Sequence, residues 1–121
     1  MFPPIFAVCA ADPAVTALLC ATPTRFYPFG EAPQGVIYPY AVWQLVGGQP
    51  ENYINQRPDI DNYTLQVDVY ADTVASARAV ASALRDAIEL HAYITRWGGE
   101  SVDPETKRYR ISFDADWFVH R

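Results

Sequence analysis

Apolar and polar residues alternate most regularly in the last segment of the chain, RYRISFDADWFVHR. From Tyr109 to Val119 every second residue is apolar, and the residues between them are mostly polar. This period of two predicts a strand with one buried face. The charge on the opposite face changes sign along the polar positions, which are Arg108, Arg110, Ser112, Asp114 and Asp116. That face meets either water or a second protein surface, and the pattern alone leaves both open.

The segment NYTLQVDVYA also alternates and predicts a second strand. We expect Leu65, Val67 and Val69 to face inward, and Asp68 and Tyr70 to face outward. The strand is therefore expected to contribute one face to the core and the other to the surface.

The segment GVIYPYAVWQLVGG is apolar at both odd and even positions. A strand with this pattern is typically covered on both faces, and Pro39 within it favours an edge position or a bulge. A small domain readily covers only one of these faces from within. The segment is therefore a first sign of a protein partner.

Apolar residues at spacings of three and four predict a helix from about residue 73 to residue 90. Asp72 or Thr73 is expected to cap it. Its apolar stripe consists of Val74, Ala77, Ala81, Leu84 and Ile88. Near the N-terminus, the start signals Pro3–Pro4 and Asp12–Pro13 predict a helical segment that is kinked or divided in two.

Polar connections complete the predicted order. Residues Gly47 to Asp61 are rich in turn formers and are expected to form a long loop, which is usually a functional or mobile feature. GGESVDPETK is expected to connect a strand in HAYITRW to the C-terminal strand, and a short extended piece is expected at Arg25–Tyr27. The order α–β–β–α–β–β predicts an α+β fold, a mostly antiparallel sheet with two helical segments packed on one face. One domain is expected to span residues 1–121.

Composition narrows the function. The chain has 121 residues, half of them apolar, and a net charge of −5. It lacks the excess of Lys and Arg from which nucleic-acid binders gain most of their affinity. No run reaches the roughly 18 apolar residues of a membrane-spanning helix, and the N-terminus lacks the basic region of a signal peptide. We therefore expect a soluble protein made in the cytoplasm, with no membrane partner.

The residues that usually carry chemistry are few and scattered. Cys9 and Cys20 favour a pair of buried thiols over a disulfide or a reactive thiol. His91 and His120 have no neighbour at a metal-ligand spacing. The two aspartates of the C-terminal strand could run acid–base chemistry as a pair, but the arginines on the same face favour a solvated or ion-paired surface. No catalytic, cofactor or metal site is predicted, and the protein is not expected to be an enzyme.

Three stretches of the chain follow one another in a recognisable order. The first is DPAVTALLC. The second, RFYPFGEAPQGVIYPYAVWQLVGGQPENY, has an extended R-x-Y-P piece, an A-P-Q-G turn and a P-Y strand that closes on glycine. The third, LQVDVYADTVASARAVASALRDAI, has a Q-x-D-x-Y-A strand that leads into an Ala-rich helix. Together with the C-terminal strand, this ordered set resembles the tail terminator (tail completion) proteins of long-tailed bacteriophages.

The resemblance implies a structural role without catalytic residues. Members of this family form a ring, typically of six subunits, on the head-proximal end of the tail tube. The ring ends tube polymerisation and provides the surface to which the head joins. The implied partners are other copies of the chain, the major tail tube protein and a head-completion or neck protein. The resemblance also implies a virion protein of the neck or tail, assembled in the host cytoplasm. DNA is expected to pass through the ring without specific binding, and the acidic net charge agrees because it repels phosphate.

Contact positions are inferred from the residues themselves. Large rings at outward strand positions are typical of protein interfaces, and opposite charges on one strand suit a head-to-tail contact between subunits. The predicted subunit interface consists of Tyr38, Tyr40, Tyr70, Arg108, Arg110, Asp114, Asp116 and Phe118. The predicted contact with the tail tube or neck lies in the long polar loop and consists of Gln49, Glu51, Asn52, Tyr53, Asn55 and Gln56.

Two alternatives accompany this reading. One is another neck component, such as a head-completion or adaptor protein. The other is a small enzyme or ligand-binding α+β domain. This last function would need a convergent polar pocket, for which the sequence offers no constellation of residues.

Overall fold

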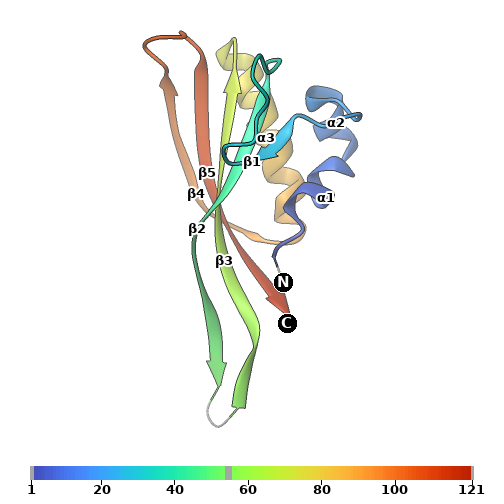
Figure 1. The fold of residues 1–121 in the computed structure, drawn as a ribbon, viewed down its shortest axis with the longest axis vertical. Coiled ribbons are helices and arrows are strands. Elements are labelled where there is room, and N and C mark those ends of the chain that lie inside the picture. Colours follow the sequence, from blue (N-terminus) through green and yellow to red (C-terminus); the bar gives the residue numbers. More distant parts are fainter. Residues whose placement is uncertain (1, 54–55, 121) are drawn as a thin grey trace.

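In the computed structural model, which describes residues 2–53 and 56–120, three helices lie against one face of a five-stranded sheet (Figure 1). The side chains at 48–59 lie outside this description. The elements in chain order are α1 (Ile5–Ala10), α2 (Pro13–Leu19), β1 (Phe26–Pro28), β2 (Tyr40–Tyr53), β3 (Gln56–Ala71), α3 (Val74–Glu89), β4 (Tyr93–Val102) and β5 (Tyr109–His120). The α+β class and the predicted order of elements are confirmed. β1 is the short extended piece, and the N-terminal helical segment is divided in two.

The strands are arranged in the order β1-β2-β3-β5-β4. β1 runs parallel to β2, and the other neighbours are antiparallel. After β3 the chain crosses the sheet as α3 and returns at the far edge as β4, so that β5 fills the place between β4 and β3. This connection places α3 over the strands that carry the alternating apolar residues.

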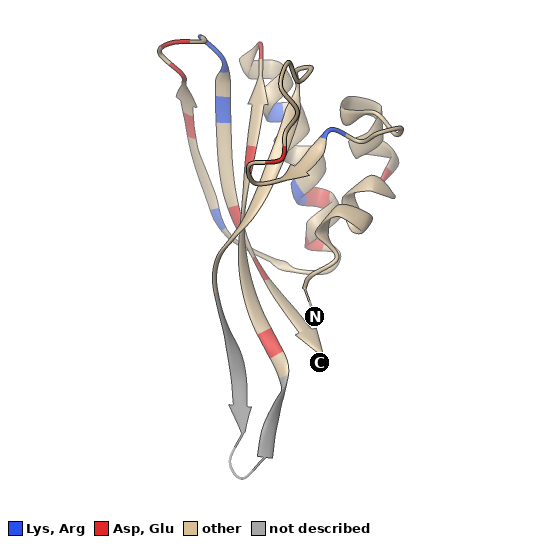
Figure 2. Ribbon diagram, in the orientation of Figure 1, with Lys and Arg blue, Asp and Glu red and all other residues tan. Residues whose placement is uncertain are grey.

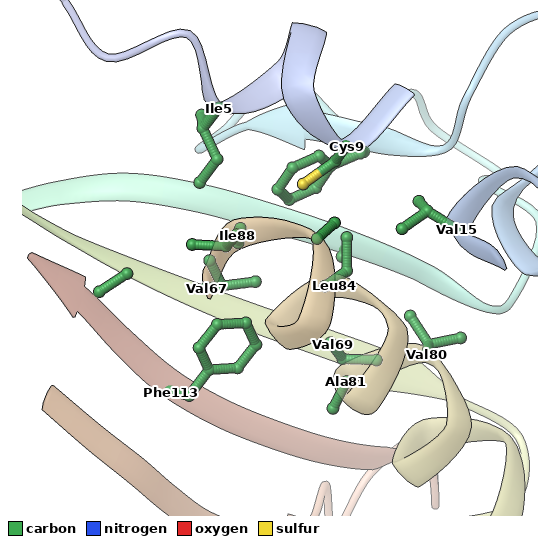
Figure 3. Packing of buried hydrophobic residues seen from close by; sticks show 14 of the residues in the cluster. Ile5, Cys9, Val15, Val67, Val69, Val80, Ala81, Leu84, Ile88 and Phe113 are labelled. Atoms are coloured by element: carbon green, nitrogen blue, oxygen red, sulfur yellow. The ribbon is translucent and has the colours of Figure 1, made fainter. Parts of the chain in front are cut away.

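The apolar face of the sheet packs beneath α3. Thr73 caps this helix, since its hydroxyl oxygen accepts a hydrogen bond from the Ser76 N–H at 3.1 Å. Leu84 of α3 is fully buried, as are Val67 and Phe113, which pair with each other on neighbouring strands (Figure 3). The buried positions of β5 are Ile111, Phe113, Ala115, Trp117 and Val119, with Ser112 between two of them. The predicted buried apolar face of this strand is confirmed.

The N-terminal helices add a further side to the core. Asp12 caps α2, because its carboxylate accepts a hydrogen bond from the Ala14 N–H at 2.9 Å. Cys9 is a buried free thiol, as predicted, whereas the free thiol of Cys20 is exposed and the prediction of burial is wrong there. α2 ends at Leu19, and Cys20, with a φ of 69°, no longer follows the buried stripe of the helix.

The polar segment at residues 47–61 is mostly the outer part of a β-hairpin, so the prediction of a long loop is wrong. β2 and β3 remain paired as far as Tyr53 and Gln56, whereas β5 follows β3 only as far as Ile60. Beyond Ile60, no third strand of the described chain joins the hairpin. A ribbon that covers no core needs no alternating apolar residues, because the hydrogen bonds that pair its two strands are made by backbone groups and do not require an apolar face. The sequence pattern therefore did not reveal it.

Two other strand limits differ from expectation. The strand predicted from residue 35 begins at Tyr40. β4 extends to Val102, although its last residues were expected to form a connection. The register between β4 and β5 shifts between Trp97 and Glu100, so the two intervening glycines mark a bulge within the strand and not its end.

Candidate functional site

The face of the sheet opposite the helices carries the polar positions of β3 and β5; we call it the helix-free face. Thr64, Gln66, Asp68 and Tyr70 of β3 pair with Asp116, Asp114, Ser112 and Arg110 of β5, in that order. Charges of both signs lie along these strands (Figure 2). Four of the predicted interface residues are therefore neighbours on one surface.

Asp114 already has a partner within its own chain. The guanidinium of Arg96, on β4, donates hydrogen bonds to both carboxylate oxygens at 3.0 Å and to the Ser112 hydroxyl at 2.7 Å. This two-pronged geometry gives the strongest charge-assisted hydrogen bonds, and it raises the pKa of Arg96. Gly98 leaves the necessary room, since a Cβ there would lie 1.9 Å from Arg96 Nη1. Sequence reasoning did not single out Arg96, whose partner is eighteen residues away in the chain.

Two more aspartates on the helix-free face are also satisfied internally. Asp68 is buried although no described helix covers it, and it accepts hydrogen bonds from Arg110 at 2.9 Å and from the Gln66 amide at 3.1 and 3.2 Å. Asp116 accepts a hydrogen bond from the Thr64 hydroxyl at 2.7 Å. The charges that suggested a contact between subunits are thus largely paired within one subunit.

Tyrosine rings gather at one end of the helix-free face. The Tyr40 ring lies between those of Tyr38 and Tyr70, at centroid distances of 5.2 and 5.1 Å. Burial and the two neighbouring tyrosines raise the pKa of Tyr40 to about 12. Its hydroxyl therefore stays protonated near neutral pH and is able to donate a hydrogen bond. We call these three residues the tyrosine cluster.

Arg108 covers one side of the tyrosine cluster. Its guanidinium lies 4.4 Å from the centroid of the Tyr38 ring and forms an ion pair with Asp72. A cavity of about 310 Å³ lies between the cluster and the turn that joins β4 to β5, and Arg110 and Pro104 also line it. Five of the eight predicted interface residues thus meet around one hollow.

Phe118 lies near the other end of β5. Its ring is 6.0 Å from that of Tyr93 on β4, measured between centroids. Eight residues separate Phe118 from Arg110 along the strand, which corresponds to about 26 Å. The predicted interface residues therefore line an extended surface and do not form one compact site.

The predicted tube or neck contact falls on the β2–β3 hairpin. The backbones of Gln49, Glu51, Asn52 and Tyr53 belong to β2, and that of Gln56 begins β3. Their side chains lie outside the description, and Asn55 lies outside the described residues altogether. The structure thus places this segment in a hairpin without deciding its contacts.

Sequence reasoning missed an apolar surface along the outer edge of β2. Leu45 and Val46 are each 47% exposed, so the strand that was expected to be covered on both faces is open here. A cavity of about 290 Å³ beside it is lined by Phe2, Pro28, Phe29, Trp43, Gln44 and Leu45. The signal available in the sequence was that this segment is apolar at both odd and even positions. They indicated a partner without locating its surface.

The groups that usually carry chemistry make structural contacts. The His91 ring stacks on Trp117 with 6.4 Å between centroids. Arg25 donates a hydrogen bond to the sulfur of Cys20 at 2.9 Å, and burial raises the pKa of the Cys9 thiol to about 12. Among residues 2–53 and 56–120, no group of three or more His, Cys, Asp or Glu side chains is placed to hold a metal ion. In the same part of the chain no helix is long and apolar enough to cross a membrane.

The fold is similar to that of a chain in a solved structure of the virion of a native gene transfer agent (GTA) particle. The TM-score is 0.69 at 16% sequence identity, and the similarity covers 97% of this chain and 92% of the other. At this level of identity the likeness concerns the fold. No curated protein matches the chain significantly.

A protein-family model establishes the class of protein. It matches residues 3–120, nearly the whole chain, and describes a component that completes the phage tail. The protein is thus a structural protein of the bacteriophage tail and a component of the virion. It belongs to the family of the tail completion protein gp17. The resemblance seen in the ordered sequence stretches is confirmed.

Proposed function

We propose that this protein forms a ring on the head-proximal end of the tail tube, where it ends tube polymerisation and provides the surface for head joining. The family match over residues 3–120 carries the proposal, because a complete tail is one that has stopped growing and is ready to receive a head. The similar chain in the GTA virion supports it, since that chain occupies an assembled particle. The copy number we propose is six, the number typical of the family.

The tyrosine cluster is the proposed centre of one subunit contact. Rings of Tyr38, Tyr40 and Tyr70 border a cavity of about 310 Å³ that is large enough for a side chain of the next subunit. Packed aromatic rings with a polar tip are typical centres of binding energy in protein interfaces. Arg110 and Arg108 line the same cavity and offer hydrogen-bond donors at its border. The β2–β3 hairpin, with Gln49 to Gln56, is the proposed contact with the tube or a neck protein.

DNA is proposed to pass through the ring without being held. Arg96, Arg108 and Arg110, on the helix-free face and its border, are each paired with an aspartate. Proteins gain affinity for DNA by placing Lys and Arg on phosphates, and a guanidinium already held by a carboxylate is less available for this. At about 50 mM salt, where nonspecific binding is strong, duplex DNA should not bind the protein in fluorescence anisotropy titrations. Tight binding under these conditions would contradict free passage.

Electron microscopy of particles from a phage deleted for this gene tests the main proposal. We expect overlong tails that are not attached to heads, because tube growth continues and the joining surface is missing. Supplying the gene from a plasmid should restore both tail length and attachment. Tails of normal length in the deletion strain would reject a terminating role. Normal-length free tails together with filled heads would point instead to another head-completion or adaptor protein of the neck.

A further inference from the structure

Most charged side chains of this protein have a partner within their own chain. Among the side chains at residues 2–47 and 60–120, only two carboxylates make no hydrogen bond or ion pair with another described residue, and these are Glu31 and Glu105. In the same ranges only one cation, Lys107, has no such partner. All three side chains are exposed. A neighbouring protein can therefore meet these charges without first breaking a contact.

Glu31 ends a turn that the backbone holds in place. We call residues 28–31 the β1 turn. The Glu31 N–H donates a hydrogen bond to the Pro28 oxygen at 3.1 Å, and Gly30 has the positive φ, 74°, that a type II turn requires at its third position. The Phe29 N–H donates to a backbone oxygen of β2 at 2.9 Å, and the Phe29 side chain is 65% exposed. The β1 turn thus presents an aromatic ring and a free carboxylate together.

The cavity beside the tyrosine cluster offers groups that complement such a turn. Lys107 lies between Thr106 and Arg108, and both of these neighbours line the cavity. The Nε of Arg108 is buried and has no acceptor among the described residues. Because an unmet buried donor is costly, this favours an oxygen acceptor as the incoming group. Asp103 fixes the turn that carries Lys107, since its backbone oxygen accepts a hydrogen bond from the Lys107 N–H at 2.8 Å. The cavity thus combines aromatic rings with a free cation at its border.

We infer that the β1 turn of one copy docks at the tyrosine-cluster cavity of the next copy, where Glu31 pairs with Lys107 and Phe29 packs on the tyrosine rings. The inference rests on the proposed ring and names the group that fills the cavity. A second copy is the occupant because the chain itself supplies both members of the charge pair. Glu105 is excluded as the partner, since it lies on the same turn as Lys107 and a head-to-tail contact joins two different surfaces.

The two surfaces lie at opposite edges of the sheet. β1 and β4 are its edge strands, and the β1 turn follows the first, whereas the turn with Lys107 follows the second (Figure 1). Among the described residues that line the tyrosine-cluster cavity, none comes from the β1 turn of the same copy. A contact between different surfaces repeats from copy to copy and closes into a ring when the rotation allows. An exposed ion pair alone contributes little, so we expect the pair to set orientation and partner choice beside the aromatic contact.

Cross-linking with a carbodiimide tests the contact. This reagent condenses a carboxylate and an amine that lie in contact into an amide, and Lys107 is the only lysine of the chain. Isotope-labelled and unlabelled protein are mixed, added to tail tubes isolated from a phage deleted for this gene, and then treated. We expect mass spectrometry to find peptides that join Glu31 of one isotope to Lys107 of the other. Lys107→Arg keeps the charge but removes the amine, so it should cap tubes normally and give no such peptide.

Charge reversal tests the pair itself. Glu31→Lys or Lys107→Glu alone places like charges together at every contact of the ring. We expect the protein concentration that caps half of the tubes, scored by electron microscopy, to rise by more than about tenfold. Both reversals in one chain restore opposite charges and should bring this concentration back to within about threefold of its original value. Glu105→Lys makes the same charge change at the other free carboxylate and, as the matched control, should leave capping unchanged. Circular dichroism should show every variant folded, because these side chains are exposed.

The outcomes separate this contact from the ring itself. Capped tubes without mixed-isotope peptides between Glu31 and Lys107 would overturn the contact and leave the proposed function standing. The contact would also be overturned by a double reversal that caps as poorly as the single ones, or by Glu105→Lys impairing capping as much as Glu31→Lys. If tubes keep growing in the presence of the unaltered protein, the proposed function is rejected. Mixed-isotope peptides in that sample would still support the contact, whereas their absence would overturn it.

Discussion

On the helix side of the sheet, burial comes from apolar packing, whereas on the helix-free face it comes from ion pairs and hydrogen bonds. Phe113 and Ser112 are neighbours in β5 and both are buried. Phe113 lies in the core on the side of α3, whereas Ser112 lies under the guanidinium of Arg96. Asp68 is buried in a similar way beside Arg110. An outward position in an alternating strand is therefore not necessarily free to meet a partner.

The difference matters for stability as well as for binding. Apolar burial stabilises in proportion to area and depends little on salt or pH. An ion pair that stays partly exposed contributes little on average, although leaving a buried carboxylate without its partner is costly. We therefore expect the core face to dominate stability and the helix-free face to respond mainly when a buried partner is removed.

Phe113→Ala should have the largest effect. Removing a fully buried ring from the core costs about 3–5 kcal/mol, and the fraction folded should fall accordingly in urea denaturation followed by circular dichroism. Phe118→Ala, on the opposite face of the same strand and 45% exposed, is the matched control and should cost less than about 1 kcal/mol. Equal losses for the two variants would show that the faces do not differ as described.

Gly98→Ala should disturb the join between β4 and β5. A Cβ at this position would lie 2.2 Å from the backbone oxygen of Ser112 and 1.9 Å from Arg96 Nη1. Such crowding typically costs about 1–3 kcal/mol, measured by thermal or urea denaturation. Gly99→Ala adds the same methyl group where nothing lies within 4 Å, so it should be nearly neutral. A nearly neutral Gly98→Ala would contradict the close approach of Arg96.

Asp68→Ala should show the cost of an unsatisfied polar face. It leaves Arg110 and the Gln66 amide without their shared acceptor, which typically costs about 1–3 kcal/mol. Asp86→Ala removes an exposed aspartate that pairs with Arg85, and exposed pairs contribute at most about 1 kcal/mol. Denaturation curves that rank these two variants in reverse would show that the helix-free face is held by other contacts.

The ion pair between Arg78 and Glu100 should give the smallest effect, and one that depends on pH. The hydrogen bond from Arg78 lowers the pKa of Glu100 below its usual value of 4.5. A lowered pKa in the folded state stabilises the protein above pH 4.5, and this contribution is lost as the pH falls through the folded-state pKa. In Arg78→Met, NMR titration should show the pKa of Glu100 returning toward its usual value. Arg78→Lys keeps the positive charge and should give Glu100 an intermediate pKa. If the pKa of Glu100 is unchanged in both variants, the contact between Arg78 and Glu100 is excluded.

Several features of the fold were predictable because they follow from local chemistry. The alternating apolar residues of β5 and the apolar stripe of α3 were each expected to be buried in the core. Phe113 of β5 and Leu84 of α3 belong to the same buried cluster. Asp12 was expected to cap one helix, and Asp72 or Thr73 the other, because their side-chain oxygens satisfy free N–H groups. Asp12 and Thr73 do so. For the binding surface, sequence position correctly placed Tyr70 and Arg110 on the outward face. It gave no sign that Asp68, which lies next to this pair on the same face, would be buried.

The periodicity of this chain was enough to establish its α+β class and its core face, since burying apolar residues requires a pattern that repeats with the element. The β2–β3 hairpin, the exposed Cys20 and the pairing of Arg96 with Asp114 had no such signature. They depend on which strands the topology makes neighbours, and eighteen residues separate Arg96 from its partner. Which strands lie at the two edges of the sheet likewise follows from the order β1-β2-β3-β5-β4, because an edge strand is defined only by how all the strands pair.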